Sequence, residues 1–392
     1  MPPRLSPTVA AIQSPPIPEA QAWARAWDAA CGPLIDLSQA APGGAPHPDL
    51  LERLAAAAGS ADAARYGPIL GDDALRAALA ADVSGLYDGR VEAADVAITA
   101  GCNAAFVTTM LAIAAPGDAV LLPTPWYFNH EMTLAMLGIA ARPLPCRAQD
   151  GFVPRAEEAD ALVDTLSDAR VRAIVLVTPN NPTGAIYPPA TIAAFAELAR
   201  ARGIWLVVDE TYRDFLPAGA GAPHGLFRDG RWREGVVHLY SFSKSYAVPG
   251  HRLGALVAGP ALVEAAGKIL DNVQICPARA GQAAVAWAIA ALRPWREEAR
   301  ATLEGRAAAF AAALSPLPGW EIASIGPYFA YVRHPWRAEP AAAVARRLAA
   351  ERGVLMLPGS FFGPGQEEYL RVAFANVDAA RLAMVGERLG AG

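Results

Sequence analysis

The sequence predicts a large α/β domain with a mostly parallel sheet sandwiched by helices, and a smaller α+β domain after it. Apolar runs alternate with helical stretches through the middle of the chain, and such continuous Val/Ile/Leu strands are typical of a parallel sheet covered on both faces. At 392 residues the chain is long for one ordinary domain. After residue 285 strands become fewer, which favours α+β. We expect an N-terminal arm over 1–49 that forms part of the small domain, a large domain over 50–285 and a small domain over 286–392.

The arm is rich in proline and glycine, which disfavour helix and strand interiors. One short helix is expected from Glu19 to Ala30, with Trp23 and Trp27 on one face, four residues apart, where they would dock against a neighbouring surface. We interpret the arm as lying on the body of the protein or on a second subunit. A frayed terminus is the alternative.

The remaining elements follow from hydrophobic periodicity and from helix start and stop signals. In the large domain we expect helices at 49–57, 72–86, 104–115, 131–137 and 190–202, and strands at 96–99, 119–122, 171–177, 204–208, 235–240 and 255–258. In the small domain we expect a long helical region at 278–314, strands at 328–332, 354–357 and 370–374, and helices at 341–352 and at the C-terminus.

Composition excludes several classes of protein. Hydrophobic residues make up 54% and charged residues 18%, with a net charge of −5, which disfavours disorder and a nucleic-acid partner. Neither a basic amphipathic helix nor an uninterrupted apolar run of about 18 residues is present, so no membrane association is expected. The four cysteines have no CxxC spacing, which disfavours disulfides and a structural zinc, and no metal site is expected. The first residues lack a secretory h-region. We therefore expect a cytoplasmic protein whose cysteines are reduced.

Polar groups follow four of the predicted strands. A Gly101-Cys102-Asn103 turn ends one strand and starts a helix, where free amides and the helix dipole attract phosphate. The other three strands are followed by Pro179 to Gly184, by Asp209 to Tyr212, and by Ser241 to Gly254, which contains Lys244 and Arg252. Taken alone, the Gly101-Cys102-Asn103 turn is explained better as an ordinary turn, and Lys244 as a solvated lysine. Ligands of open α/β sheets bind beyond the carboxyl ends of the strands, so the four segments together predict a site.

Pyridoxal phosphate chemistry requires this set of groups. The cofactor aldehyde needs a lysine amine, and the ring nitrogen needs a carboxylate to stay protonated. The phosphate needs amides, hydroxyls and an arginine. The carboxylate of an amino-acid substrate is best held by another arginine through two parallel hydrogen bonds.

From about Ile35 to the last helix the chain resembles the class I/II aminotransferases, which are fold-type-I pyridoxal-phosphate enzymes. The resemblance rests on motifs in the family's order. They are Asn-Pro-Thr-Gly at 181–184, Asp-Glu-x-Tyr at 209–212, the lysine signature at 241–254, and Pro-Gly-Ser-Phe-Phe-Gly at 358–363 followed by Leu-Arg-Val at 370–372.

The resemblance implies a role for each matching residue. Lys244 would form the internal aldimine and move the proton between the substrate Cα and the cofactor, and Asp209 would pair with the ring nitrogen. Asn181 and Tyr212 would hydrogen-bond the phenolic oxygen, and Asn181 would also border the substrate. Tyr127, rather than Trp126, would stack on the ring, and Arg371 would bind the substrate α-carboxylate. Tyr66 would contact the phosphate bound by the other subunit of a homodimer. The phosphate would be bound by Gly101, Cys102, Asn103, Ser241, Ser243 and Arg252.

Three departures from the family pattern affect the expected site. Cys102 stands where a small hydroxyl residue is common, which removes one phosphate contact. Ala40 stands where many relatives have glycine near the substrate, which narrows the pocket. His130 stands where a second tyrosine is frequent, and a packed or surface position is the plainer interpretation of this histidine.

The resemblance implies an aminotransferase that moves an amino group from an L-amino acid to a 2-oxo acid in two ping-pong half-reactions. A lyase on the same fold, such as a carbon–sulfur β-lyase or a cyclopropane-forming synthase, is the alternative, because fold does not settle the reaction. A non-catalytic sensor domain of a transcription regulator would need a DNA-binding module, which the arm is too short and too weakly charged to form. No second arginine can be placed opposite Arg371, which disfavours a strict dicarboxylate substrate. Four aromatic residues suggest an apolar side-chain pocket, although core packing explains them as well, namely Trp126, Phe128, Tyr328 and Phe329.

Overall fold

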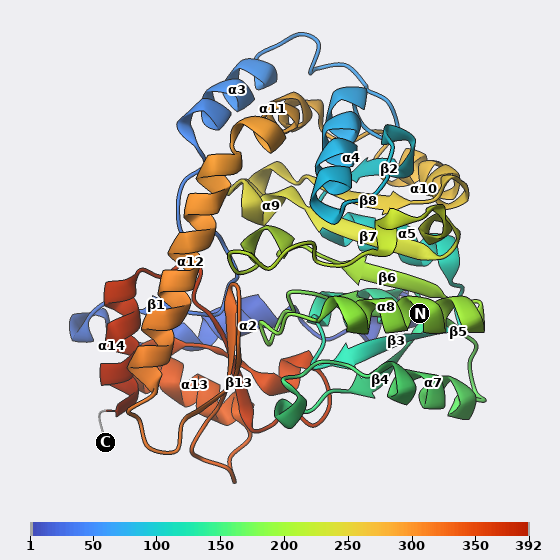
Figure 1. The fold of residues 1–392 in the computed structure, drawn as a ribbon. Helices are drawn as coiled ribbons and strands as arrows, with labels where there is room; N and C mark the ends of the chain where they lie inside the picture. The colour runs from blue at the N-terminus through green and yellow to red at the C-terminus, as the bar shows by residue number, and fades with distance from the viewer. Residues whose placement is uncertain (1–2, 391–392) are drawn as a thin grey trace.

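The computed structural model describes residues 3–390 and shows a seven-stranded sheet beside a four-stranded one (Figure 1). The large sheet contains β2 (Val96–Thr99), β3 (Ala119–Thr124), β4 (Ala140–Pro145), β5 (Val171–Val177), β6 (Trp205–Asp209), β7 (Val236–Ser241) and β8 (Gly254–Ala258). Their order is β2-β8-β7-β6-β5-β3-β4; β3 to β7 pair in parallel, and β8 is antiparallel to both neighbours. The predicted mostly parallel sheet is confirmed.

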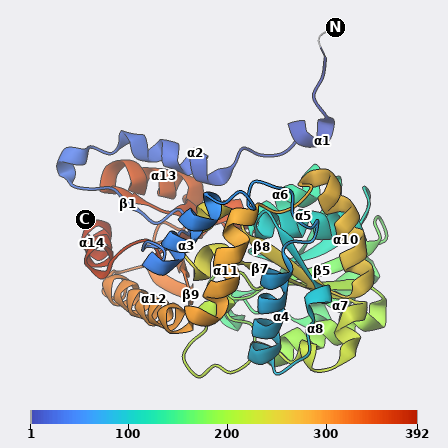
Figure 2. The same ribbon diagram turned by 90° about the horizontal axis from the view of Figure 1, so that it is seen from above.

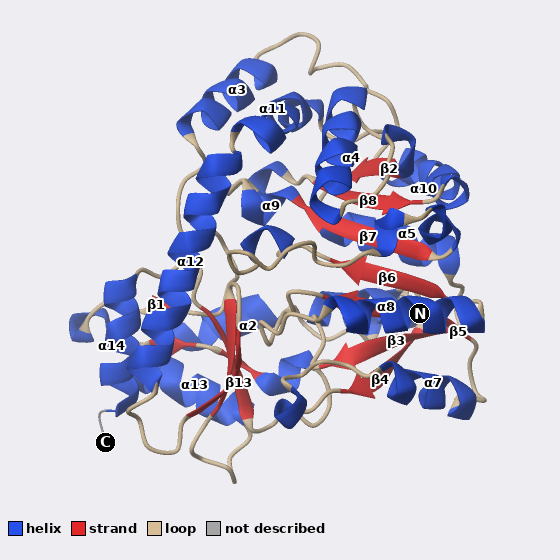
Figure 3. Cartoon of the chain, viewed as in Figure 1, coloured by secondary structure: helices blue, strands red, loops and turns tan. Residues whose placement is uncertain are grey.

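Helices cover both faces of this sheet, as Figure 3 shows by colour. The helices of the N-terminal half are α1 (Pro7–Ala10), α2 (Pro16–Trp23), α3 (Pro48–Ala58), α4 (Asp73–Tyr87), α5 (Cys102–Ile113), α6 (Phe128–Met136), α7 (Ala156–Thr165) and α8 (Pro189–Arg202). Those of the C-terminal half are α9 (Phe242–Ser245), α10 (Pro260–Val273), α11 (Arg279–Ala291), α12 (Arg293–Leu314), α13 (Ala341–Arg352) and α14 (Ala379–Gly390).

Successive strand residues point to opposite faces of the large sheet, and both faces are apolar. In β6, Val207 packs in one core with α5 and α10, whereas Leu206 and Val208 pack in another with α8. Figure 2 shows α5, α6 and α10 on one side of the strands and α4, α7 and α8 on the other. The polar residues that end the strands therefore lie at the edge of the sheet and not on its faces.

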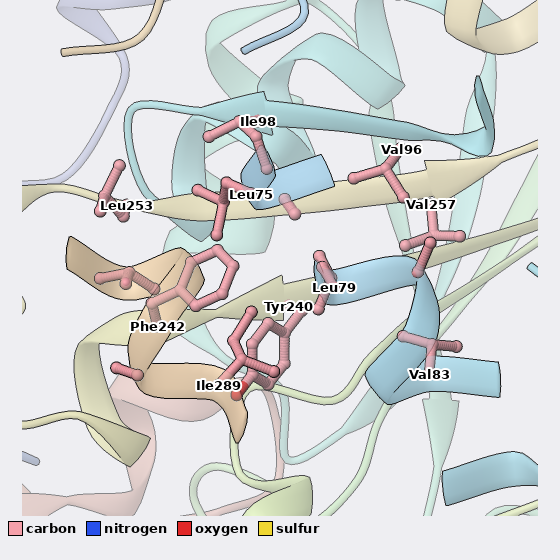
Figure 4. Packing of buried hydrophobic residues seen from close by; sticks show 14 of the residues in the cluster. Leu75, Leu79, Val83, Val96, Ile98, Tyr240, Phe242, Leu253, Val257 and Ile289 are labelled. Carbon is pink, nitrogen blue, oxygen red and sulfur yellow. The ribbon is translucent and has the colours of Figure 1, made fainter. Parts of the chain in front are cut away.

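One core cluster anchors the short helix α9. Phe242, the first residue of α9, packs among Leu75 and Leu79 of α4, Tyr240 of β7 and Ile289 of α11 (Figure 4). All five side chains are buried. The residues that follow Phe242 in the chain therefore start from a rigid position.

The smaller sheet has the order β12-β13-β10-β9 and is antiparallel. Its strands are β9 (Glu321–Ile325), β10 (Phe329–Arg333), β12 (Leu357–Pro358) and β13 (Tyr369–Ala373), and β1 (Ile35–Asp36) pairs in parallel with β11 (Val354–Leu355). Ile35 shares a core with Phe310 of α12, Leu348 of α13 and Val372 of β13. The N-terminal segment thus packs with the C-terminal elements, as expected for the arm. Residues 1–2 and 391–392, which the predicted arm and small domain include, lie outside the described residues.

The helix predicted from Glu19 to Ala30 is wrong in extent. Helix α2 ends at Trp23, and Trp27 is extended (ψ 129°), so the two tryptophans do not share a helical face. The indole of Trp27 donates a 2.9 Å hydrogen bond to Gly32 O, which stabilises the non-helical segment after α2. A Cβ on Gly353, where φ is +60°, would lie 2.4 Å from this indole, so only glycine allows the close packing.

The long helical region predicted over 278–314 is confirmed, and it is divided at Leu292 into α11 and α12. Pro294 causes the break: its missing N–H is tolerated only in the first turn of a helix. Among residues 3–390, no helix combines the length and the apolar character needed to cross a bilayer.

Candidate active site

A cavity of about 230 Å³ lies at the carboxyl edge of the large sheet, bordered by the ends of β5, β6 and β7 and by the start of α5. Parallel strands bring their carboxyl ends to one edge, which explains how segments far apart in sequence meet there. Twelve of the fourteen predicted site residues line this cavity: Ala40, Cys102, Asn103, Tyr127, Asn181, Asp209, Tyr212, Ser241, Ser243, Lys244, Arg252 and Arg371.

Lys244 lies in α9, so the predicted connection between β7 and β8 contains one turn of helix. The Ser241 side chain caps this turn by accepting from Ser243 N at 3.3 Å. The half-buried Lys244 amine donates a 2.5 Å hydrogen bond to Ala40 O. Burial, reinforced by the charges of Arg252 and Arg371, lowers the pKa of Lys244 to about 8. The amine is therefore deprotonated more readily than an ordinary lysine. The chain has one other lysine, Lys268, whose side chain is exposed.

Asp209 places a buried carboxylate in the wall of the cavity. Its Oδ2 lies 3.2 Å from His130 Nε2, and its Oδ1 accepts from the Thr211 amide and hydroxyl at 3.0 and 2.7 Å. Burial alone would raise the pKa of Asp209, but the hydrogen bonds and charge from His130 and the bonds from Thr211 outweigh it and leave the pKa below its ordinary value. Asp209 is held as a carboxylate, suited to a protonated ring nitrogen.

His130 was named only as a departure from the family pattern, and its contact with the Asp209 carboxylate was not expected. It is buried, stacks on Phe106 with ring centroids 4.0 Å apart, and contacts Asp209. A packed position was the plainer expectation, and the structure adds the carboxylate contact to it. Thr211 was also missed, although its place two residues after Asp209 is a signal, since hydroxyl residues often bond a nearby Asp side chain.

The opposite end of the cavity presents donors suited to a phosphate. Helix α5 begins there, and free amides at a helix N-terminus attract anions. Gly101 lies behind the wall with φ +87°, and a Cβ on it would be 2.3 Å from Arg252 Nη2. The hydroxyls of Ser241 and Ser243 complete this end. Cys102 contributes no hydroxyl; its Sγ lies 3.8 Å from Asp209 Oδ2, and burial raises the pKa of the thiol.

Arg371 lies on the small-domain side of the cavity, in β13. Its guanidinium donates to Ser38 O and, at 3.2 Å, to Asn181 Oδ1. The rings of Phe329 and Phe362 lie 5.3 and 5.2 Å from its Cζ. Burial lowers the pKa of Arg371 to about 10. A buried guanidinium whose Nε has no hydrogen-bond partner is suited to a carboxylate ligand.

Three further predicted residues meet between these ends. Tyr127 accepts a 2.9 Å hydrogen bond from Asn129 Nδ2, and burial raises its pKa to about 12. Tyr212 packs against Tyr328, with ring centroids 4.9 Å apart, and burial raises its pKa. Asn181 uses its oxygen to accept from Arg371, which leaves its NH₂ group to donate into the cavity.

Tyr66 is not brought into the cavity. Its side chain is 80% exposed, in the link between α3 and α4. Of the four aromatic residues expected to form a side-chain pocket, Phe128 lines the cavity, whereas Trp126, Tyr328 and Phe329 do not. Tyr328 and Phe329 belong to a core cluster between the two sheets, so core packing accounts for them.

Comparisons with known proteins agree with this geometry. The family model "Aminotransferase class I and II" matches residues 33–389. A valine–pyruvate aminotransferase of Mycobacterium tuberculosis is 31% identical over 354 residues, 88% of this chain and 87% of the relative. A capreomycidine synthase of Streptomyces vinaceus is 32% identical over 340 residues, 83% and 81% of the two chains. The crystal structure of an aminotransferase from Mycobacterium tuberculosis superposes with a TM-score of 0.88 at 26% identity, covering 99% and 98%. The chain therefore belongs to the class I and II aminotransferases, a family of pyridoxal-phosphate-dependent enzymes.

Proposed function

We propose that this enzyme transfers the amino group of an L-amino acid to a 2-oxo acid, with Lys244 as the base. The observation that carries this proposal is the position of the Lys244 amine in one cavity with the Asp209 carboxylate and the Arg371 guanidinium. An amine with a pKa of about 8 holds and releases a proton near neutral pH.

The donor set of the cavity fits pyridoxal phosphate. A buried carboxylate, a half-buried lysine and a group of hydroxyls and amides beside Arg252 correspond to the ring nitrogen, the aldehyde and the phosphate. The close approach of Arg252 to Gly101, which a Cβ would block, keeps the guanidinium at the phosphate end. When bound, the cofactor supplies a conjugated ring that accepts the electron pair left on the substrate Cα.

Each step then depends on a residue of this chain. Arg371 orients the substrate by its α-carboxylate, which places the Cα hydrogen toward Lys244. Lys244 Nζ would take the proton from the substrate Cα. Asp209, held by His130, would hold the ring nitrogen of the cofactor in its protonated form, and Asn181 and Tyr212 would donate to its phenolic oxygen. Tyr127 would stack on the ring.

We propose an amino donor with an uncharged side chain. Among residues 3–390 the cavity wall contains three cations, Lys244, Arg252 and Arg371, and the roles above use all three. Further apolar surface comes from Ile17, Phe128, Val177 and Pro249, and further amide groups come from Gln39 and Asn129. Initial rates for a panel of donors, with pyruvate and with 2-oxoglutarate, test this. A kcat/KM for aspartate above those for valine and leucine would refute it.

A second candidate function is a lyase or synthase reaction that uses the same lysine. The likeness to a capreomycidine synthase supports it. Incubation with an amino donor and without an oxo acid separates the two. A transaminase releases about one 2-oxo acid per site and stops with the cofactor in its amine form. A lyase continues to release product without an acceptor.

We also propose a homodimer with shared active sites. Tyr66 is exposed in the same segment as Ile69, which is also exposed, and Gly67 N donates to Cys276 Sγ. This bond joins the segment to the end of α10, where Val273 and Ile275 are exposed. Mixing Tyr66→Phe with Lys244→Ala subunits tests sharing, because hybrid dimers would contain one intact site. The proposed domain boundaries and the cytoplasmic location rest on the sequence alone.

A further inference from the structure

Asp214 lies behind the cavity and uses both carboxylate oxygens. Its Oδ2 accepts from the hydroxyl of Tyr240 at 2.6 Å and from the hydroxyl of Ser245 at 2.5 Å. Its Oδ1 accepts from Arg296 Nη1 at 2.7 Å. The side chains of Asp214 and Arg296 are only 8% and 9% exposed, and neither residue lines the cofactor cavity.

These bonds join the segments of Lys244 and Tyr212, which the proposed chemistry uses, to helix α12. Ser245 directly follows Lys244 in α9. Asp214 belongs to a single 3-10 turn, Arg213–Phe215, which directly follows Tyr212. Arg296 lies in the first turns of α12, the helix that runs from the large sheet to the small domain (Figure 1). The carboxylate is thus the junction of the lysine segment, the tyrosine segment and the interdomain helix.

The junction is built from charged groups. Burial alone would raise the pKa of Asp214, but the charges of Arg296 and Arg213 hold it below its ordinary value. Arg213 Nη2 donates to Asp82 at 2.7 Å, and Asp82 also lies 3.7 Å from Arg296 and 3.5 Å from Arg293. Tyr240 and Tyr246 stack near the two buried guanidiniums, 4.1 Å from Arg213 and 5.3 Å from Arg296. A neutral residue in place of Asp214 would leave Arg296 with Asp82, 3.7 Å away, as its charged partner and with its hydrogen bond to Ile289 O at 3.0 Å.

The backbone around Lys244 needs such an anchor. Helix α9 is four residues long, and three residues after Lys244, at Ala247, φ is already +54°, a conformation that costs an alanine free energy. Phe242 fixes the start of the turn through the core. The end of the turn is held by Tyr246, which directly follows α9 and is buried in the same core, and by hydrogen bonds of the Ser245 hydroxyl to Asp214 and Tyr240.

We propose that Asp214 is a positioning residue for Lys244, and that its ion pair with Arg296 ties the direction of the Lys244 amine to α12. This proposal rests on the proposed function only for the identity of the base. The Asp214–Ser245 bond holds the amine toward the reacting carbon, and the Asp214–Arg296 pair carries movements of α12 to the same turn.

The test compares Asp214→Asn and Ser245→Ala with Asp95→Asn in the holoenzyme. Asp95 is a matched control: its carboxylate is equally buried, 3% exposed, and Arg233 holds it with two hydrogen bonds, at 2.9 and 2.6 Å, outside the cavity wall. Three readouts are taken: the pH midpoint of the visible absorption of the bound cofactor, kcat against KM for the amino donor, and hydrogen exchange of peptide 241–247 in the cofactor-free protein.

We expect Asp214→Asn and Ser245→Ala to shift the midpoint by about half a pH unit or more and to lower kcat about tenfold with KM nearly unchanged, because a displaced base loses reaction geometry before substrate binding. Exchange in 241–247 should increase in both variants and not in Asp95→Asn. If all three variants change only the melting temperature, Asp214 is merely structural and the proposal is overturned. Ser245→Ala decides the matter if Asp214→Asn does not fold.

The two proposals fail in different ways. A wild-type protein whose cofactor absorption resists borohydride would refute Lys244 as the base. Amide hydrogen exchange in peptide 241–247 would still show whether Asp214 holds that turn. An unchanged exchange rate in Asp214→Asn would refute the positioning role alone.

Discussion

Replacing Lys244 by methionine should stabilise the cofactor-free protein at neutral pH. The pKa of this lysine falls from 10.5 to about 8 on folding, first because of burial and then because of Arg252 and Arg371. At about 1.4 kcal/mol per pKa unit, the protonated amine destabilises the folded protein by at most about 3 kcal/mol. Since Lys244 is half-buried and solvent reaches the cavity, screening reduces this to about 2 kcal/mol.

The sign of the effect fixes its pH dependence. Below pH 8 both folded and unfolded chains carry the proton, so the folded state bears the full cost. Between about pH 8 and 10.5 the folded state loses the proton first, and the wild type gains stability as the pH rises. The advantage of Lys244→Met should therefore be largest at pH 7 and fade toward pH 10.

Denaturant unfolding of cofactor-free protein at pH 7, 8.5 and 10 measures this difference. Lys268→Met is the matched control, because the Lys268 side chain is 74% exposed on α10. We expect the control to match the wild type at all three pH values. Equal stability of Lys244→Met and wild type at pH 7, or a difference that persists at pH 10, would refute a buried amine with a lowered pKa.

Three other substitutions test the remaining parts of the site. Gly101→Ala adds a Cβ 2.3 Å from Arg252 Nη2 at φ +87°; cofactor titration should show at least about tenfold weaker binding, at a strain of about 1–2 kcal/mol. Arg371→Lys loses two parallel hydrogen bonds to carboxylate, so KM for the donor should rise about 100-fold while cofactor absorption is unchanged; an unaltered KM would contradict the role. His130→Phe removes a group that lowers the pKa of Asp209. Stability gained from Asp209 is lost as pH falls through its folded pKa, so acid unfolding, followed by circular dichroism, should start at higher pH, and an unchanged midpoint would count against the contact.

The fold and most of the cavity wall could be predicted because both depend on local sequence. Apolar strands such as β5 and β6 are continuous and end at a polar residue, so their ends, and the site at those ends, can be read directly. Strand β4 was missed because it contains Pro143 and Pro145, which are tolerated at the edge of a sheet, where β4 lies.

Contacts between distant segments could not be predicted. His130 lies in α6, which follows β3, and β3 lies two places from β6 in the sheet. His130 therefore reaches Asp209 at the end of β6 only because of the order of the strands, which the sequence does not reveal. Asp214 meets Arg296 only because α12 starts beside the turn after Tyr212. The sequence left pocket and core positions open for Tyr328 and Phe329 for the same reason, and the structure places both in a core cluster.

We propose that the Lys244 amine binds the cofactor aldehyde and acts as the base. Borohydride reduction of the holoenzyme would attach the cofactor permanently to that lysine, and peptide mass spectrometry would then identify it. The chain offers two lysines, Lys244 and Lys268. We predict loss of the visible absorption and a phosphopyridoxyl mass on the peptide that contains Lys244, with none on Lys268 and no label in Lys244→Ala. A label on Lys268, or an absorption band that survives reduction, would show that Lys244 does not bind the cofactor aldehyde.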